Sequence, residues 1–93
     1  MKHPAYISLA KVLNEALLQA AEGKGKERHA SDGEAFEHQP ICELGRRLGG
    51  GALYQAVKKI YESQRLLGEA GVRELLGAIN YIAAEIIVKR ERF

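Results

Sequence analysis

The sequence predicts a single all-α domain, 1–93, built as a small helical bundle. Three observations support this fold class. Apolar residues recur at helical spacing in four segments, no segment alternates apolar and polar residues as a half-buried strand does, and glycines or prolines stand at the segment boundaries. Because so small a domain buries a modest share of its unfolded surface, we expect the chain to assemble as a homo-oligomer.

The first predicted helix spans about residues 4–22 and opens at Pro4, a residue that is tolerated in a first helical turn. Its apolar positions at helical spacing are Tyr6, Leu9, Ala10, Leu13, Leu17, Ala20 and Ala21. The periodicity then ends, and a long basic loop is expected at 23–39. In this loop only Ala35 and Phe36 are suited to anchor to a core.

Two further helices are expected on either side of a glycine triplet. A short helix of about residues 40–48 begins with Pro40, and the glycines at 49–51 interrupt it. A third helix of about residues 52–67 follows, with Gly68 as its expected C-terminal stop. Its pattern predicts that it buries Leu53, Val57, Ile60 and Leu67.

The last helix, of about residues 69–90, has the longest apolar pattern of the chain. Its predicted core stripe is Val72, Leu75, Leu76, Ile79, Ile82, Ala83, Ile86 and Ile87. Four more apolar residues widen this surface beyond what one packed face requires: Ala78, Tyr81, Ala84 and Val88. We therefore expect part of the helix to contact another subunit.

Composition limits the classes of function. Lys and Arg total 14 against 12 acidic residues, a formal net charge of +2, which is too balanced to require a nucleic acid as partner. The single cysteine, Cys42, suits a reducing compartment, and no apolar run has the length of a signal peptide or a membrane span. We expect a cytoplasmic protein without a membrane partner.

The basic loop is the first candidate site. Lys24, Lys26, Arg28 and His29 follow one another closely, and glycines between the lysines allow the backbone to approach a ligand. An arginine binds a phosphate through two parallel hydrogen bonds, so this pattern predicts an anionic, phosphate-bearing ligand. A solvated surface loop is the alternative.

The second candidate site is the segment that joins the second and third helices. Arg46 or Arg47 would donate to a phosphate, while backbone amides near Gly50 and Gly51 face it at a helix start. Tyr54 would stack on a base; the alternative is a core or interface aromatic. The glycines alternatively serve only as a bend. The segment lacks the Gly-Lys-Ser/Thr ending of a phosphate-loop NTPase.

A metal site has little support in the sequence. His38 and Cys42 are four residues apart, but Pro40 places His38 before the helix, and no second Cys/His pair of zinc-finger spacing exists. No complete catalytic motif is present either. We therefore expect neither a metal nor a cofactor and assign no catalytic residue.

The run 73–81, from Arg73 to Tyr81, resembles the metal-binding helix of the all-α nucleoside triphosphate pyrophosphatases. In that family, paired acidic residues on two helices hold Mg²⁺ against the phosphates. This chain lacks the Glu-x-x-Glu pair on the preceding helix, and Gly77 stands three residues after Glu74 where the family has an aspartate. A divergent pyrophosphatase therefore stays an alternative, and binding without turnover is the expected activity.

A second resemblance lies in the segments Gly25–Ala30, Phe36–Ile41 and Gln55–Ile60, which look like parts of short uncharacterised proteins of bacteriophages and prophages. This resemblance covers residues 23–88 and implies a phage setting without an assigned chemistry. We expect a phage accessory protein, a host-defence antagonist, that sequesters a nucleotide in the host cytoplasm. A host-protein-binding inhibitor and a nucleic-acid-binding module are the alternatives.

Overall fold

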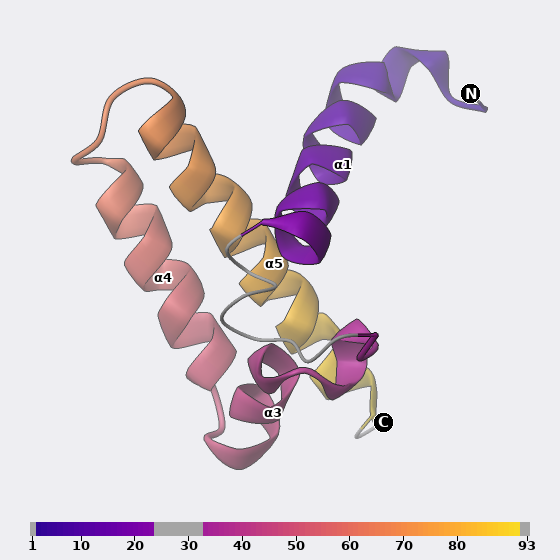
Figure 1. Ribbon diagram of the computed structural model, residues 1–93, viewed down its shortest axis with the longest axis vertical. Helices are drawn as coiled ribbons and strands as arrows, with labels where there is room; N and C mark the ends of the chain where they lie inside the picture. Colours follow the sequence, from indigo (N-terminus) through magenta and orange to yellow (C-terminus); the bar gives the residue numbers. More distant parts are fainter. Residues whose placement is uncertain (1, 24–32, 92–93) are drawn as a thin grey trace.

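The computed structural model describes residues 2–23 and 33–91 and confirms a small all-α helical bundle. Its elements, labelled in Figure 1, are η1 (Pro4–Tyr6), α1 (Ile7–Glu22), η2 (Phe36–His38), α3 (Pro40–Arg47), α4 (Gly51–Ser63) and α5 (Glu69–Glu91). No strand occurs in these two segments. Within the same residues, no helix combines the length and the apolar composition that a membrane span needs.

Helices α4 and α5 form an antiparallel hairpin, and the other helices pack against α5 (Figure 1). Helix α3 lies across the end of the hairpin that holds the start of α4 and the end of α5. Helix α1 crosses α5, and two side-chain hydrogen bonds join them. Asn80 Nδ2 donates to the Ala16 carbonyl over 2.9 Å, and Gln19 Nε2 donates to the Arg73 carbonyl over 3.0 Å.

Small side chains dominate the contact between α4 and α5. Ala52, Ala56 and Ala84 are almost fully buried, and such residues allow two helix backbones to approach closely. The core cluster consists of Ile41, Cys42, Ala52, Ala56, Tyr81, Ala84 and Val88. Phe36 packs against this cluster, which confirms it as an anchor, whereas Ala35 is exposed.

Most residues of the predicted core stripes of the last two helices are not buried, although Leu76 of α5 is buried as predicted. Leu53, Val57 and Ile60 of α4 are exposed, as are Val72, Leu75, Ile82 and Ile86 of α5. The buried positions of these helices are mostly alanine, glycine or other residues outside the predicted stripes. The reason is geometric, because alanines permit the closer helix contact and leave the larger aliphatic side chains on the opposite side.

The predicted helix of about residues 52–67 is too long. Helix α4 ends at Ser63, whose Oγ donates to the Ile60 carbonyl, and Leu67 lies 92% exposed in the connection to α5. Gly68 has a positive φ of 60° and accepts a hydrogen bond from the Val72 amide. Gly68 therefore precedes α5 and is not the C-terminal stop of α4.

Candidate anion-binding site

The candidate site has two parts, and the structure describes one of them. Lys24, Lys26, Arg28 and His29 lie outside the described residues. The part around the turn between α3 and α4 is described completely. It contains Arg46, Arg47, Gly50, Gly51 and Tyr54.

The turn between α3 and α4 gives α4 an open N-terminus. The Gly51 amide donates to the Leu48 carbonyl, and the Tyr54 amide donates to the Gly50 carbonyl over 2.9 Å. By helix geometry, the amides of Ala52 and Leu53 have no acceptor within the helix. Leu53 is exposed, whereas Ala52 is fully buried, so the Leu53 amide is the one that a ligand can reach. These amides and the helix dipole together create a region of positive potential at the start of α4.

Gly50 and Gly51 have structural reasons to be glycine. Gly50 adopts a left-handed conformation with a φ of 81°, which most side chains disfavour. A Cβ on Gly51 would lie 3.0 Å from both the carbonyl oxygen and the Cγ of Leu44. The bend alone therefore accounts for these two glycines, and it also brings the end of α3 next to the amides of α4.

Arg46 is engaged in ion pairs that fasten α3 to the end of α5. Its Nε and Nη2 donate to the two carboxylate oxygens of Glu91 over 2.9 and 2.6 Å, and its Nη1 donates to Glu43 over 2.6 Å. Nη2 also donates to the Glu37 carbonyl. The hydrogen bonds from Arg46 to Glu91 raise the pKa of the guanidinium above its ordinary value. An anionic ligand would have to displace two carboxylates from Arg46.

Arg47 is the more available of the two arginines. Its side chain is 80% exposed, and its contact with Glu43 is a single interaction of 3.4 Å between Nε and Oε2. Such exposed pairs one helical turn apart are weak. Arg47 is therefore the arginine of this turn that is free to bind a phosphate.

Two more side chains of α4 are exposed close to its start. Tyr54 is 68% exposed, so it does not belong to the core of this chain, and Lys58 lies one turn further along the same side. The neighbouring Lys59 differs, because its Nζ lies 3.3 Å from Glu74 and its stem packs against Gly77. An aromatic ring and a cation thus remain exposed beyond the open amides.

The environment of Cys42 is that of a core residue. Cys42 is fully buried, and burial raises the pKa of its thiol. His38 lies on η2 and is exposed. Among the residues that the structure describes, no group of three or more His, Cys, Asp or Glu side chains is arranged to hold a metal ion.

The ion pairs of Arg46 are the feature that sequence reasoning missed. Glu43 stands three residues before Arg46 and four before Arg47, a spacing that is visible in the sequence and typical of helical ion pairs. Glu91 is 45 residues from Arg46, so no local pattern indicates that contact. Only the packing of α3 across the end of α5 reveals it.

Glu43 is expected to make the protein sensitive to acid. Hydrogen bonds from Arg46, and then from Arg47, lower the pKa of this carboxyl below its ordinary value of 4.5. A lowered pKa means that the ionised carboxylate stabilises the fold near neutral pH, and that this contribution is lost as the pH falls through the folded-state pKa. Glu43→Gln should therefore lower the melting temperature more at pH 7 than at pH 3. Circular dichroism melts at both pH values test this, and an equal loss at both would contradict it.

The chain matches no protein-family model, no curated protein and no solved structure. Both resemblances, to the phage proteins and to the pyrophosphatases, therefore stay predictions. The features of the chain that bear on function are the geometry of the turn between α3 and α4 and the composition of the basic loop.

Proposed function

We propose that this protein is a non-enzymatic binding protein that sequesters a phosphate-bearing nucleotide. The observation that carries the proposal is the combination, at the turn between α3 and α4, of an exposed arginine, Arg47, with the exposed first-turn residue Leu53, whose amide has no acceptor within the helix. A phosphate accepts hydrogen bonds from both kinds of donor. Tyr54 supplies an exposed ring that suits stacking on a base.

The basic loop completes the proposed site. In the sequence it lies between α1 and η2, and its composition supplies Lys24, Lys26, Arg28 and His29 as further candidate phosphate-binding residues. A nucleotide carries several negative oxygens, so a second group of cations would add charge-assisted hydrogen bonds. In this proposal Lys24, Lys26 and Arg28 contact the phosphates together with Arg47.

The surroundings of Glu74 favour binding over hydrolysis. In the pyrophosphatase alternative, Glu74 would hold a metal ion together with acidic residues of the preceding helix. Its carboxylate instead pairs with Lys59 of that helix over 3.3 Å, and Lys59 packs on Gly77, where that family has an aspartate. A cation thus occupies the position that the hydrolytic arrangement needs for a carboxylate.

The biological setting of the proposal follows from the resemblance to phage proteins. Sequestering a host signalling nucleotide requires tight binding and no turnover, and it makes the protein an antagonist of host defence in the host cytoplasm. The buried, unpaired Cys42 is compatible with such a reducing compartment. The many exposed apolar side chains support a homo-oligomer as the working form.

A second candidate function is the inhibition of a host protein by direct contact. The exposed apolar side chains of the first half of the chain favour it, since Tyr6, Leu13 and Leu17 are each about half exposed or more. An amphipathic helix of this kind can occupy a groove of a partner protein. In this alternative no nucleotide would be needed.

A thermal-shift screen tests the proposed function. The panel contains cyclic dinucleotides, NAD-derived nucleotides, (d)NTPs and short duplex DNA, each with and without Mg²⁺. A ligand at about 100 times its Kd stabilises the folded state by about 2.7 kcal/mol, so the melting temperature should rise by roughly 10–20 °C for one nucleotide class. The bound nucleotide should be recovered intact.

Other outcomes of the screen would overturn the proposal in different ways. Hydrolysed nucleotide in the presence of Mg²⁺ would favour the pyrophosphatase. Stabilisation by duplex DNA alone, with an affinity that falls steeply as salt rises, would favour a nucleic-acid-binding module. No stabilisation by any member would leave the protein-binding function as the better candidate.

A further inference from the structure

We propose that one side of the α4–α5 hairpin is the interface through which two copies of this chain pair about a two-fold axis. This hairpin face consists of Leu53, Val57 and Ile60 of α4 and Val72, Leu75, Ile79, Ile82 and Ile86 of α5. Helix α5 packs antiparallel on α5 of the second copy, and α4 packs on the second α4. The pairing rests on the homo-oligomer of the proposed function, and because it needs no nucleotide it can be tested separately from nucleotide binding.

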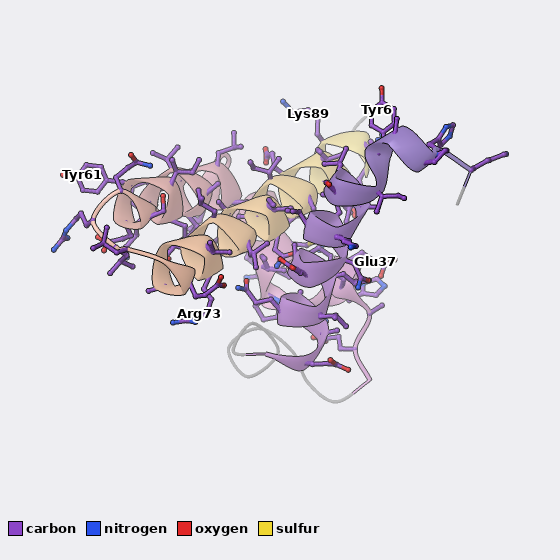
Figure 2. All side chains as sticks on the ribbon, turned by 90° about the horizontal axis from the view of Figure 1, so that it is seen from above. Tyr6, Glu37, Tyr61, Arg73 and Lys89 are labelled. Atoms are coloured by element: carbon purple, nitrogen blue, oxygen red, sulfur yellow. The ribbon has the colours of Figure 1, made fainter. Side chains whose placement is uncertain are left out.

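The α4 residues and the α5 residues of the hairpin face both lie on the side of the hairpin that faces away from α1. The position of Gly77 is contacted by Lys59 of α4 and by Gln19 of α1, so Lys59 marks the α1 side of α4. The three α4 residues of the hairpin face lie roughly 100–160° around the helix from Lys59. On α5, the Arg73 carbonyl and the Asn80 side chain form hydrogen bonds with α1. The α5 residues of the hairpin face lie on another side of α5. Figure 2 shows Arg73 and Lys89 on opposite sides of the hairpin.

The hairpin face consists of apolar residues and is left uncovered by residues 2–23 and 33–91. Seven of its eight residues are exposed, from 38% for Val72 to 64% for Val57. Its two stripes run side by side, because α4 and α5 are adjacent antiparallel helices (Figure 1). An apolar surface of this kind is typical of a protein–protein interface.

The spacing of the α5 stripe makes it complementary to itself. Val72 and Ile86 stand seven residues before and after Ile79, while Leu75 and Ile82 stand four before and three after. Two such helices that pack antiparallel about Ile79 bring Val72 opposite Ile86 and Leu75 next to Ile82. An isologous two-fold contact requires this reciprocal pairing.

The α4 residues of the hairpin face can pair about the same two-fold axis. Val57 is its middle residue, and the contact of Lys59 with Gly77 places Val57 level with the turn of α5 that contains Ile79. A single two-fold axis that passes by Val57 and Ile79 therefore pairs α4 with the second α4 and α5 with the second α5. The product is a four-helix bundle of two hairpins, a common way to bury two apolar helix faces.

Charges at the two ends of α5 agree with the antiparallel direction. Glu69 is in the first turn, and Lys89 and Arg90 are in the last. Glu69 stands ten residues before Ile79, and Lys89 stands ten residues after it. Antiparallel pairing brings the acidic end of each α5 level with the basic end of the other, whereas parallel pairing would place like charges together.

The size of the face fits a second copy of the hairpin. From Val72 to Ile86 the α5 part of the face spans about 21 Å, and from Leu53 to Ile60 the α4 part spans about 10 Å, so with helices about 10 Å wide the flat apolar footprint is about 300 Å². A standard interface buries roughly 800 Å² per partner and has an apolar centre with a polar rim, so this face fits the centre of such an interface. A single helix would cover one stripe and leave the other exposed.

Analytical ultracentrifugation of the ligand-free full chain tests the pairing. The unmodified protein should contain an even number of chains. Val57→Glu and Ile79→Glu should each reduce the mass to half or less, because a buried charge then faces its own copy. Leu67→Glu is the matched control, because Leu67 is exposed but lies outside the face. A monomeric unmodified protein, or variants with unchanged mass, would overturn the proposal.

Two additional measurements keep the test decisive if a variant is poorly folded. Mixing Val57→Glu with Val57→Lys should restore the paired mass, since the opposite charges meet at the axis. Ile79→Cys should form a disulfide-linked dimer under mild oxidation at least about ten times faster than Leu67→Cys, although Leu67 is 92% exposed. Equal or faster linkage through position 67, or a mixture that stays unpaired, would show that another surface joins the copies.

Discussion

Replacing Arg47 with alanine is expected to weaken nucleotide binding by roughly ten- to a hundredfold, since a hydrogen bond to a charged group contributes about 1.5–3 kcal/mol. Arg47 is the exposed arginine at the end of α3, and its ion pair with Glu43 is long, at 3.4 Å. Arg28→Ala in the basic loop should cause a loss of the same order. Isothermal titration calorimetry with the best nucleotide of the screen measures both effects.

Arg65→Ala is the matched control for this prediction. Arg65 follows the other end of α4 and pairs with Glu62 over 3.2 Å, much as Arg47 pairs with Glu43. Its removal changes the net charge by the same amount but should alter the affinity less than about twofold. Helicity and oligomer size should be unchanged in all three variants. Equal losses at positions 47 and 65 would point to nonspecific electrostatics, and no loss at positions 28 and 47 would remove the site.

Replacing Ala84 with leucine is expected to have the largest effect on stability. Ala84 is fully buried in the cluster that contains Ala52 and Ala56, where the α4 and α5 backbones approach closely. A larger side chain in a packed core costs about 1–3 kcal/mol, which corresponds to a fall in melting temperature of roughly 5–20 °C for a domain of this size. Circular dichroism melts at a fixed protein concentration measure it.

The control for this variant is Ala21→Leu, because Ala21 lies exposed near the end of α1. The same substitution there should change the melting temperature by no more than about 3 °C. If Ala84→Leu melted like the unmodified protein, the contact between α4 and α5 could not depend on small side chains. The account of why the aliphatic stripes face outward would then fail.

The sequence was sufficient to predict the helices but not the sides that they bury. Apolar spacing, Pro4 and Pro40 locate the helices to within a few residues, apart from the end of α4. Spacing alone identifies a stripe of large aliphatic residues and says nothing of what covers it. In this fold the alanines at 52, 56 and 84 form the contact, so the stripe that contains Val57 is left outside.

The candidate site was predictable in composition and only partly in arrangement. The sequence brings Arg46 and Arg47 next to the glycines but cannot distinguish them, because the difference depends on Glu91 at the far end of the chain. The sequence likewise does not decide whether Tyr54 is buried or exposed. The packing of α4 leaves its side chain exposed. Tertiary packing decides both cases.

The most direct test of the central claim is an NMR titration of the isotope-labelled protein with the nucleotide that stabilises it most. The account predicts that the amide signals of Gly51, Ala52 and Leu53 shift in a saturable manner, together with those of the basic loop. Arg47→Ala should abolish these shifts while the rest of the spectrum is retained. Saturable binding that leaves the amides at the start of α4 unchanged, or no binding at millimolar nucleotide, would contradict the account.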